Sequence, residues 1–155
     1  MTETELQSRI RRIMEPGDPA RVPVAAAPAV SAAEMAAMID HTLLKANAEP
    51  AQIRELCDQA LSHHFGAVCV NSCWVADCAT VLAGSGVKVA TTIGFPLGAV
   101  PSEVKACESE RSVQDGADEL DMVINIGVLK AGRHDLVAAD VAAVVQVARR
   151  AARPV

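Results

Sequence analysis

The chain has 155 residues, 51% of them hydrophobic, and this composition is enough for one folded domain with a real core. Its formal net charge of −5 and the lack of a long apolar run make nucleic acid and membranes improbable partners, since those partners select clustered basic residues or a spanning segment. The five cysteines form an odd set within apolar segments, which indicates reduced thiols and a cytoplasmic location.

Residues 1–31 are predicted to form an N-terminal helix and a linker, apart from the main domain at 32–155. An amphipathic helix is expected over residues 3–14, where four apolar side chains share one face: Leu6, Ile10, Ile13 and Met14. The following stretch to Val30 is rich in proline and alanine, and proline withholds the backbone donors that helices and sheets need. We therefore expect an extended linker there.

From Ser31 onward, short apolar runs alternate with helical periodicity. Strands are predicted over 39–44, 67–70, 87–93 and 119–124. Helices are predicted over 31–38, from Pro50 past Leu61, over 72–83 with Ser72 as the cap, from Pro101 to Gly116, and over 133–152. The order is that of repeated strand–helix units.

Alternating units of this kind predict an α/β fold with a parallel sheet and right-handed crossovers. The sheet could be an open doubly wound sheet or part of a TIM (β/α)₈ barrel. Polar residues inside the strands favour the barrel, because an open sheet covered on both faces would bury Asp40, Thr42 and Asp121 at high cost. In a barrel these side chains can point toward the axis near the active-site mouth. We therefore predict about four units of an incomplete TIM barrel.

Four segments resemble the deoxyribose-phosphate aldolase family in order and spacing: residues 39–45 (IDHTLLK), 67–71 (AVCVN), 86–98 (GVKVATTIGFPLG) and 115–127 (DGADELDMVINIG). The resemblance is dense from about residue 35 to the C-terminus. One departure is Ala46, where the family usually has proline, and it affects a loop outside the chemistry.

The resemblance implies a class I aldolase that needs no metal or other cofactor. Its substrate would be a phosphosugar, 2-deoxy-D-ribose 5-phosphate, split reversibly into acetaldehyde and D-glyceraldehyde 3-phosphate through a lysine Schiff base. The family carries that lysine on a late strand, whereas this chain ends at Val155, where the fifth strand would begin. We therefore expect a truncated barrel that lacks the Schiff-base lysine and is inactive alone.

Asp121 is the leading catalytic candidate, since the resemblance implies that it donates and accepts the proton. Strand parity agrees, because one face of the strand carries the apolar residues Leu120, Met122 and Ile124. The other face carries Asp121, Val123 and Asn125. The alternative is a buried carboxylate that only holds a neighbouring amide.

Asp40, Thr42 and Cys69 are expected to line the substrate pocket. Asp40 and Thr42 share one face of the first strand, but they could instead make strand-end hydrogen bonds to the backbone. Cys69 would face the barrel interior, although a small core residue is the more common role of such a cysteine.

Neither a metal site nor a nucleotide site is expected. Cys69, Cys73 and Cys78 lack the second pair of ligands that zinc sites show. The segment from Gly94 to Gly98 lacks the spacing of phosphate-binding loops, which favours a tight loop at the catalytic face.

The four lysines provide a further test of completeness. Lys88 begins a strand, Lys105 lies on an outer helix, and Lys45 and Lys130 are expected in solvated loops that keep an amine protonated. The alternative to an aldolase is a non-catalytic half-barrel that self-associates through its open sheet edges as a binding module.

Overall fold

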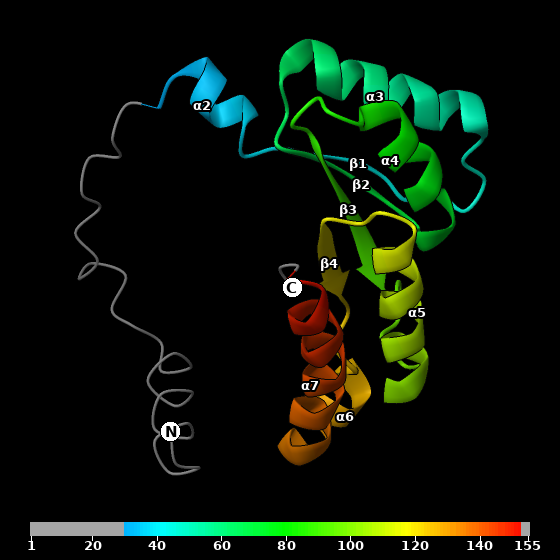
Figure 1. Ribbon diagram of the computed structural model, residues 1–155. Helices are drawn as coiled ribbons and strands as arrows, with labels where there is room; N and C mark the ends of the chain where they lie inside the picture. The colour runs from blue at the N-terminus through cyan, green and yellow to red at the C-terminus, as the bar shows by residue number, and fades with distance from the viewer. Residues whose placement is uncertain (1–29, 153–155) are drawn as a thin grey trace, which may run out of the picture. The chain divides into compact units, whose positions relative to one another are not determined.

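The computed structural model of the protein describes residues 30–152 (Figure 1). The helix predicted over 3–14 and the linker up to residue 29 lie outside the described residues. The strands are β1 (Asp40–Leu43), β2 (Ala67–Val70), β3 (Lys88–Ile93) and β4 (Glu119–Met122). The helices are α2 (Ala32–Ala36), α3 (Pro50–His63), η1 (Ser72–Trp74), α4 (Val75–Leu82), α5 (Ser102–Gln114), α6 (Ile126–Lys130) and α7 (His134–Ala151). None of the described helices is both long and apolar enough to span a membrane.

The four strands form one parallel sheet in the order β1-β2-β3-β4, so each strand pairs with its neighbour in the chain. Right-handed crossovers that always step in the same direction place their helices on the same side of the sheet. A doubly wound sheet would instead reverse direction at a switch point. The predicted barrel segment with four strand–helix units is therefore confirmed.

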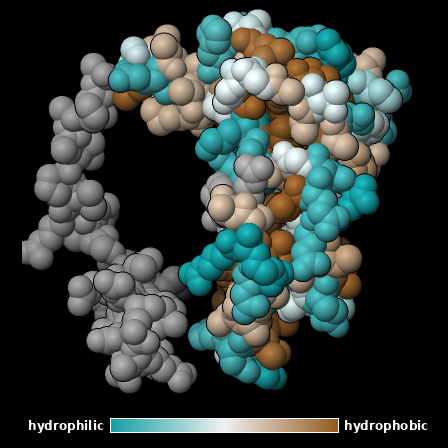
Figure 2. All heavy atoms as spheres, in the orientation of Figure 1, coloured by the Kyte–Doolittle hydropathy of each residue, from teal (hydrophilic) through white to brown (hydrophobic). Residues whose placement is uncertain are grey.

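The face of the sheet toward the helices carries the main core. Val68, Val70, Val89, Ile93 and Leu120 point to this side and are at most 2% exposed. They pack with apolar residues of α3, α4 and α7, among them Ile53, Leu56, Cys57, Val75, Cys78, Leu82 and Val144. Figure 2 shows hydrophobic atoms at the surface between the hydrophilic outer sides of the helices. Burial of this face is what holds the strands in their register.

The other face of the sheet carries small or polar residues. Ala67, Cys69 and Ala90 form a separate small buried cluster on it. The strand register places Thr42 beside Cys69, and Thr92 beside Asp121, on the same side. In a closed barrel this side becomes the interior, where the candidate site residues were predicted to lie.

The prediction that Ser72 caps a helix was wrong in detail. Ser72 begins the short turn η1, and α4 starts only at Val75. The Ser72 hydroxyl donates instead to Glu108 Oε1 on α5, at 3.0 Å. A tertiary acceptor therefore replaces the local capping bond that the sequence suggested.

The fourth strand is also shorter than predicted. It ends at Met122, and Asn125 is the N-cap of α6, with its side-chain oxygen accepting from Val128 N at 3.1 Å. Asn125 therefore does not continue the strand face that holds Asp121. Lys130, expected in a loop, is the last residue of α6.

Candidate active site

Asp121 lies on β4, one residue before the strand ends, and its side chain is exposed on the barrel-interior face. Its register partner on β3 is Thr92, a polar residue that is only 4% exposed. Within residues 30–152, no hydrogen bond or ion pair of the Asp121 carboxylate is found. The carboxylate therefore has no partner on the described strands and faces the side that a complete barrel encloses.

Cys69 marks the point where the predicted site residues come together. The pKa of the Cys69 thiol is raised to about 11, first by burial and then by the negative charges of Asp121 and Asp40, while a hydrogen bond with Thr42 opposes the rise. The strand register places Thr42 directly beside Cys69, and both carboxylates lie near enough to the sulfur to act on its charge. The structure therefore gathers residues from β1, β2 and β4 around Cys69.

Asp40 lies nearer the N-terminal ends of the strands than Asp121 does. It is the first residue of β1, and together with Lys88 and Glu119 it lines a hollow of about 440 Å³ at the N-terminal ends of the strands. Thr42 is tied to the same strand, because its hydroxyl donates to the Asp40 carbonyl oxygen at 2.7 Å. The strand-end bond considered from the sequence thus occurs for Thr42, and it leaves the Asp40 carboxylate itself exposed.

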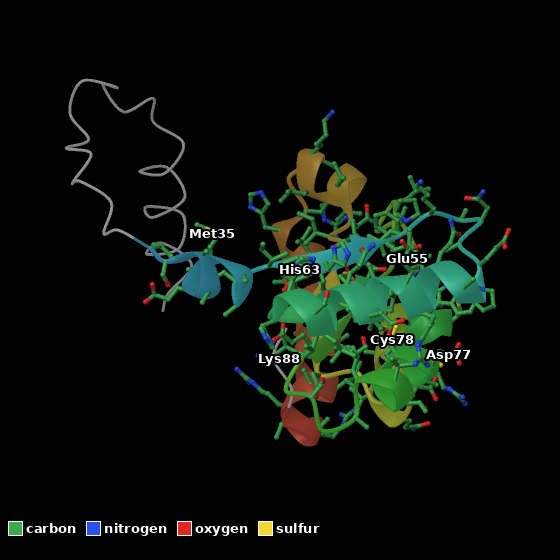
Figure 3. All side chains as sticks on the ribbon, turned by 90° about the horizontal axis from the view of Figure 1, so that it is seen from above. Met35, Glu55, His63, Asp77, Cys78 and Lys88 are labelled. Atoms are coloured by element: carbon green, nitrogen blue, oxygen red, sulfur yellow. The ribbon has the colours of Figure 1, made fainter. Side chains whose placement is uncertain are left out.

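The four lysines occupy different environments. Lys88 lies at the N-terminal end of β3 (Figure 3), where its amine contacts Glu119 Oε1 at 2.6 Å, and this hydrogen bond raises the lysine's pKa. Lys45 and Lys130 are exposed. Lys105 on α5 is completely buried and bonded to Asp140. None of the four therefore presents a desolvated, unpaired amine beside Asp121.

A match to a family model covers residues 34–153, most of the chain, and its description is DeoC/LacD family aldolase. The chain belongs to this aldolase family. A deoxyribose-phosphate aldolase of Geobacillus sp. (strain WCH70) is 56% identical over 115 residues, which is 74% of this chain and 52% of the relative. One from Lysinibacillus sphaericus is 55% identical over 117 residues, or 76% of this chain and 52% of the relative.

Solved structures agree with the fold. The deoxyribose phosphate aldolase of Aeropyrum pernix, described as tetrameric, superposes with a TM-score of 0.73 at 29% identity, covering 79% of this chain and 51% of that one. The chain spans about half the length of the curated aldolases that it matches.

Sequence reasoning missed two charged residues of α5 that hold the loops beside the candidate site. Glu108 accepts the Ser72 hydroxyl at 3.0 Å and the Gly94 amide at 2.8 Å, joining the segments that follow β2 and β3. Lys105 donates to the Val123 carbonyl oxygen, just after β4, at 2.8 Å. The sequence pattern that could have indicated its burial is that Lys105, Ser109 and Ser112 have the i, i+4, i+7 spacing of one helix face, which is the buried face of α5.

The Cys69 environment predicts a slow thiol. Because only the thiolate reacts, alkylation of Cys69 by iodoacetamide at pH 8 should be much slower than that of the exposed Cys73, and it should accelerate as the pH approaches 11. Asp121→Asn removes a negative charge and should lower the Cys69 pKa, which raises the rate at a given pH. Peptide mapping by mass spectrometry measures both rates, and equal labelling of Cys69 and Cys73 at pH 8 would contradict the described surroundings.

Proposed function

We propose that this chain forms the first four strand–helix units of a deoxyribose-phosphate aldolase, which reversibly cleaves 2-deoxy-D-ribose 5-phosphate to acetaldehyde and D-glyceraldehyde 3-phosphate in the cytoplasm. Two observations support the proposal. Curated relatives with this activity in their names share 52–56% identity with the chain. The structural observation that supports the proposal most is that Asp40, Thr42 and Asp121 share one sheet face with Cys69, the face that a complete barrel encloses.

In this proposal, the chain contributes the proton-transfer part of the site. Asp121 is the proton donor and acceptor, and Asp40, Thr42 and Cys69 line the pocket. A carboxylate on the barrel-interior face with no described hydrogen-bond partner is able to accept and return a proton during aldol cleavage. The substrate carbonyl would be held as a Schiff base by a lysine other than the four in this chain, supplied by the strands that follow β4 in a complete barrel.

The direct test of this proposal is a fused barrel. The 155-residue chain is joined to the segment of the Geobacillus relative that follows the matched region, and cleavage of 2-deoxyribose 5-phosphate is followed by a coupled assay for glyceraldehyde 3-phosphate. We expect saturable cleavage by the fused barrel and none by the added segment alone. A folded fused barrel, shown by circular dichroism, that cleaves no deoxyribose phosphate would contradict the proposal.

A second candidate is a non-catalytic half-barrel that self-associates. Among the described residues, β1 and β4 each have one edge without a strand partner, and such edges can pair with another chain. This alternative gives no reason for carboxylates to gather around Cys69. It predicts a folded but inactive fused barrel, so the same assay separates the two candidates.

A further inference from the structure

The strongest unexplained feature outside the candidate site is a buried ion pair between α5 and α7. The Lys105 side chain is 0% exposed, and its amine lies 2.5 Å from Asp140 Oδ2. The other carboxylate oxygen, Asp140 Oδ1, is buried and has no hydrogen-bond partner among the described residues. Such a pair is costly to bury and adds little stability compared with apolar residues of the same size. The ion pair alone therefore does not explain why a charged lysine is buried at this position.

A second interaction of Lys105 lies at the end of β4. The ladder between β3 and β4 runs to Ile93 and Met122, and the Val123 amide still donates to the Ile93 carbonyl oxygen at 2.9 Å. Strand β3 then ends, and the Gly94 amide turns to Glu108. The Val123 carbonyl oxygen has thus passed the last donor of β3, and the Lys105 amine donates to it at 2.8 Å. Lys105 in effect extends the ladder by one hydrogen bond.

The backbone leaves space for this lysine. Gly94 has a φ of +70°, and a Cβ at this position would lie 2.9 Å from Lys105 Cε. A glycine at the end of β3 therefore allows the lysine stem to pass directly beneath the loop. The stem, the ammonium group and its carboxylate partner are all fixed by packing, so the bond to Val123 has a defined direction.

We propose that Lys105 is a positioning residue for Asp121, held in place by Asp140. Asp121 lies two residues before Val123, on the last part of β4. Fixing the Val123 carbonyl group fixes the path of the strand end, and thereby the direction in which the Asp121 carboxylate points into the barrel. This inference rests on the proposed aldolase function, because it assigns Lys105 a role in that same site.

The competing explanation is a clamp that only joins α5 to α7. The chain offers a matched control, because Arg150 on α7 and Glu110 on α5 join the same two helices at 2.8 Å on the exposed surface. We therefore compare Lys105→Met/Asp140→Leu with Arg150→Met/Glu110→Leu. The first variant replaces the buried pair with apolar side chains of similar size, which keeps the site filled and avoids an unpaired buried charge.

In the 155-residue chain, the readout is amide hydrogen exchange by NMR. We expect the Val123 amide of Lys105→Met/Asp140→Leu to exchange about tenfold faster or more relative to amides of the β2–β3 ladder, the factor for losing a hydrogen bond to a charged group. The Arg150→Met/Glu110→Leu control should leave that ratio unchanged. An unchanged ratio in Lys105→Met/Asp140→Leu would overturn the anchoring of the strand end, whether or not the chain is an aldolase.

In the fused barrel, the readout is steady-state kinetics. Lys105→Met/Asp140→Leu should lower kcat by about 10- to 100-fold with little change in KM, because small displacements of a catalytic group have effects of this size. In an Asp121→Asn background the same change should lower kcat no further. If removing the pair lowered kcat by the same factor in the Asp121→Asn background, the pair would act independently of Asp121. That result, or an unchanged kcat when the pair is removed from the unsubstituted fused barrel, would show that the pair only joins α5 to α7. An inactive unsubstituted fused barrel would reject the aldolase function and with it this role, while the exchange result would still report on the anchor.

Discussion

Asp121→Asn in the fused barrel is expected to reduce kcat by roughly 10²–10⁴-fold, the usual contribution of general acid–base catalysis. The amide has nearly the shape of the carboxylate but cannot take up a proton. Because the Asp121 carboxylate makes no hydrogen bond within residues 30–152 that the amide would lose, its replacement should leave the fold unchanged. Turnover by the coupled assay and the thermal unfolding midpoint measure the two effects separately.

The matched control is Asp77→Asn, at an exposed aspartate near the start of α4, labelled in Figure 3. It changes the net charge by the same amount, away from the barrel interior, and should not alter kcat. If Asp121→Asn also left kcat unchanged, proton transfer would have to be assigned to another group. A large drop in the unfolding midpoint with Asp121→Asn would instead indicate a structural carboxylate.

The 155-residue chain by itself is expected to show neither deoxyribose-phosphate cleavage nor a reducible Schiff base. Each of the four lysines has surroundings that disfavour Schiff-base formation. Lys88 is ion-paired at the N-terminal end of the strands, and Lys105 is buried against Asp140. Lys45 and Lys130 are exposed, so neither amine has the desolvated surroundings that activate a Schiff-base lysine. Incubation with acetaldehyde and a borohydride reductant, followed by intact-mass measurement, should show no stoichiometric adduct.

The fused barrel under the same conditions is the positive control. The exposed lysines of the chain give the level of non-specific labelling. Slow, equal and substoichiometric labelling of Lys45 and Lys130 would reflect ordinary surface amines. Stoichiometric labelling of one lysine in the 155-residue chain, accompanied by deoxyribose-phosphate cleavage, would show that the first four units suffice for catalysis.

The arrangement of strands and helices could be predicted because it depends on local patterns. The residues of β2 form an apolar run bounded by Gly66 and Asn71, and α3 begins at Pro50 and buries residues at helical spacing. The predicted gathering of Asp40, Thr42 and Asp121 followed from alternation along parallel strands. Period-2 alternation assigns each of these side chains to one sheet face before any tertiary contact is known.

The missed features depend on contacts distant in sequence. The Ser72 hydroxyl prefers Glu108, 36 residues away, to the cap of its own helix. Strand β4 stops where its partner β3 stops, and Asn125 then caps α6. Lys105 was assigned to an outer helix, which is correct, but its burial depends on Asp140 on α7 and on the carbonyl group of Val123. No local pattern around residue 105 specifies either partner.

The central claim is that this chain supplies the proton-transferring carboxylate while the Schiff-base lysine lies outside its 155 residues. The most direct measurement is the location of the lysine that borohydride traps in the fused barrel, determined by peptide mapping. We predict stoichiometric modification of a lysine in the added segment of the Geobacillus relative. Modification of Lys45, Lys88, Lys105 or Lys130 instead would contradict the division of the active site proposed for this chain.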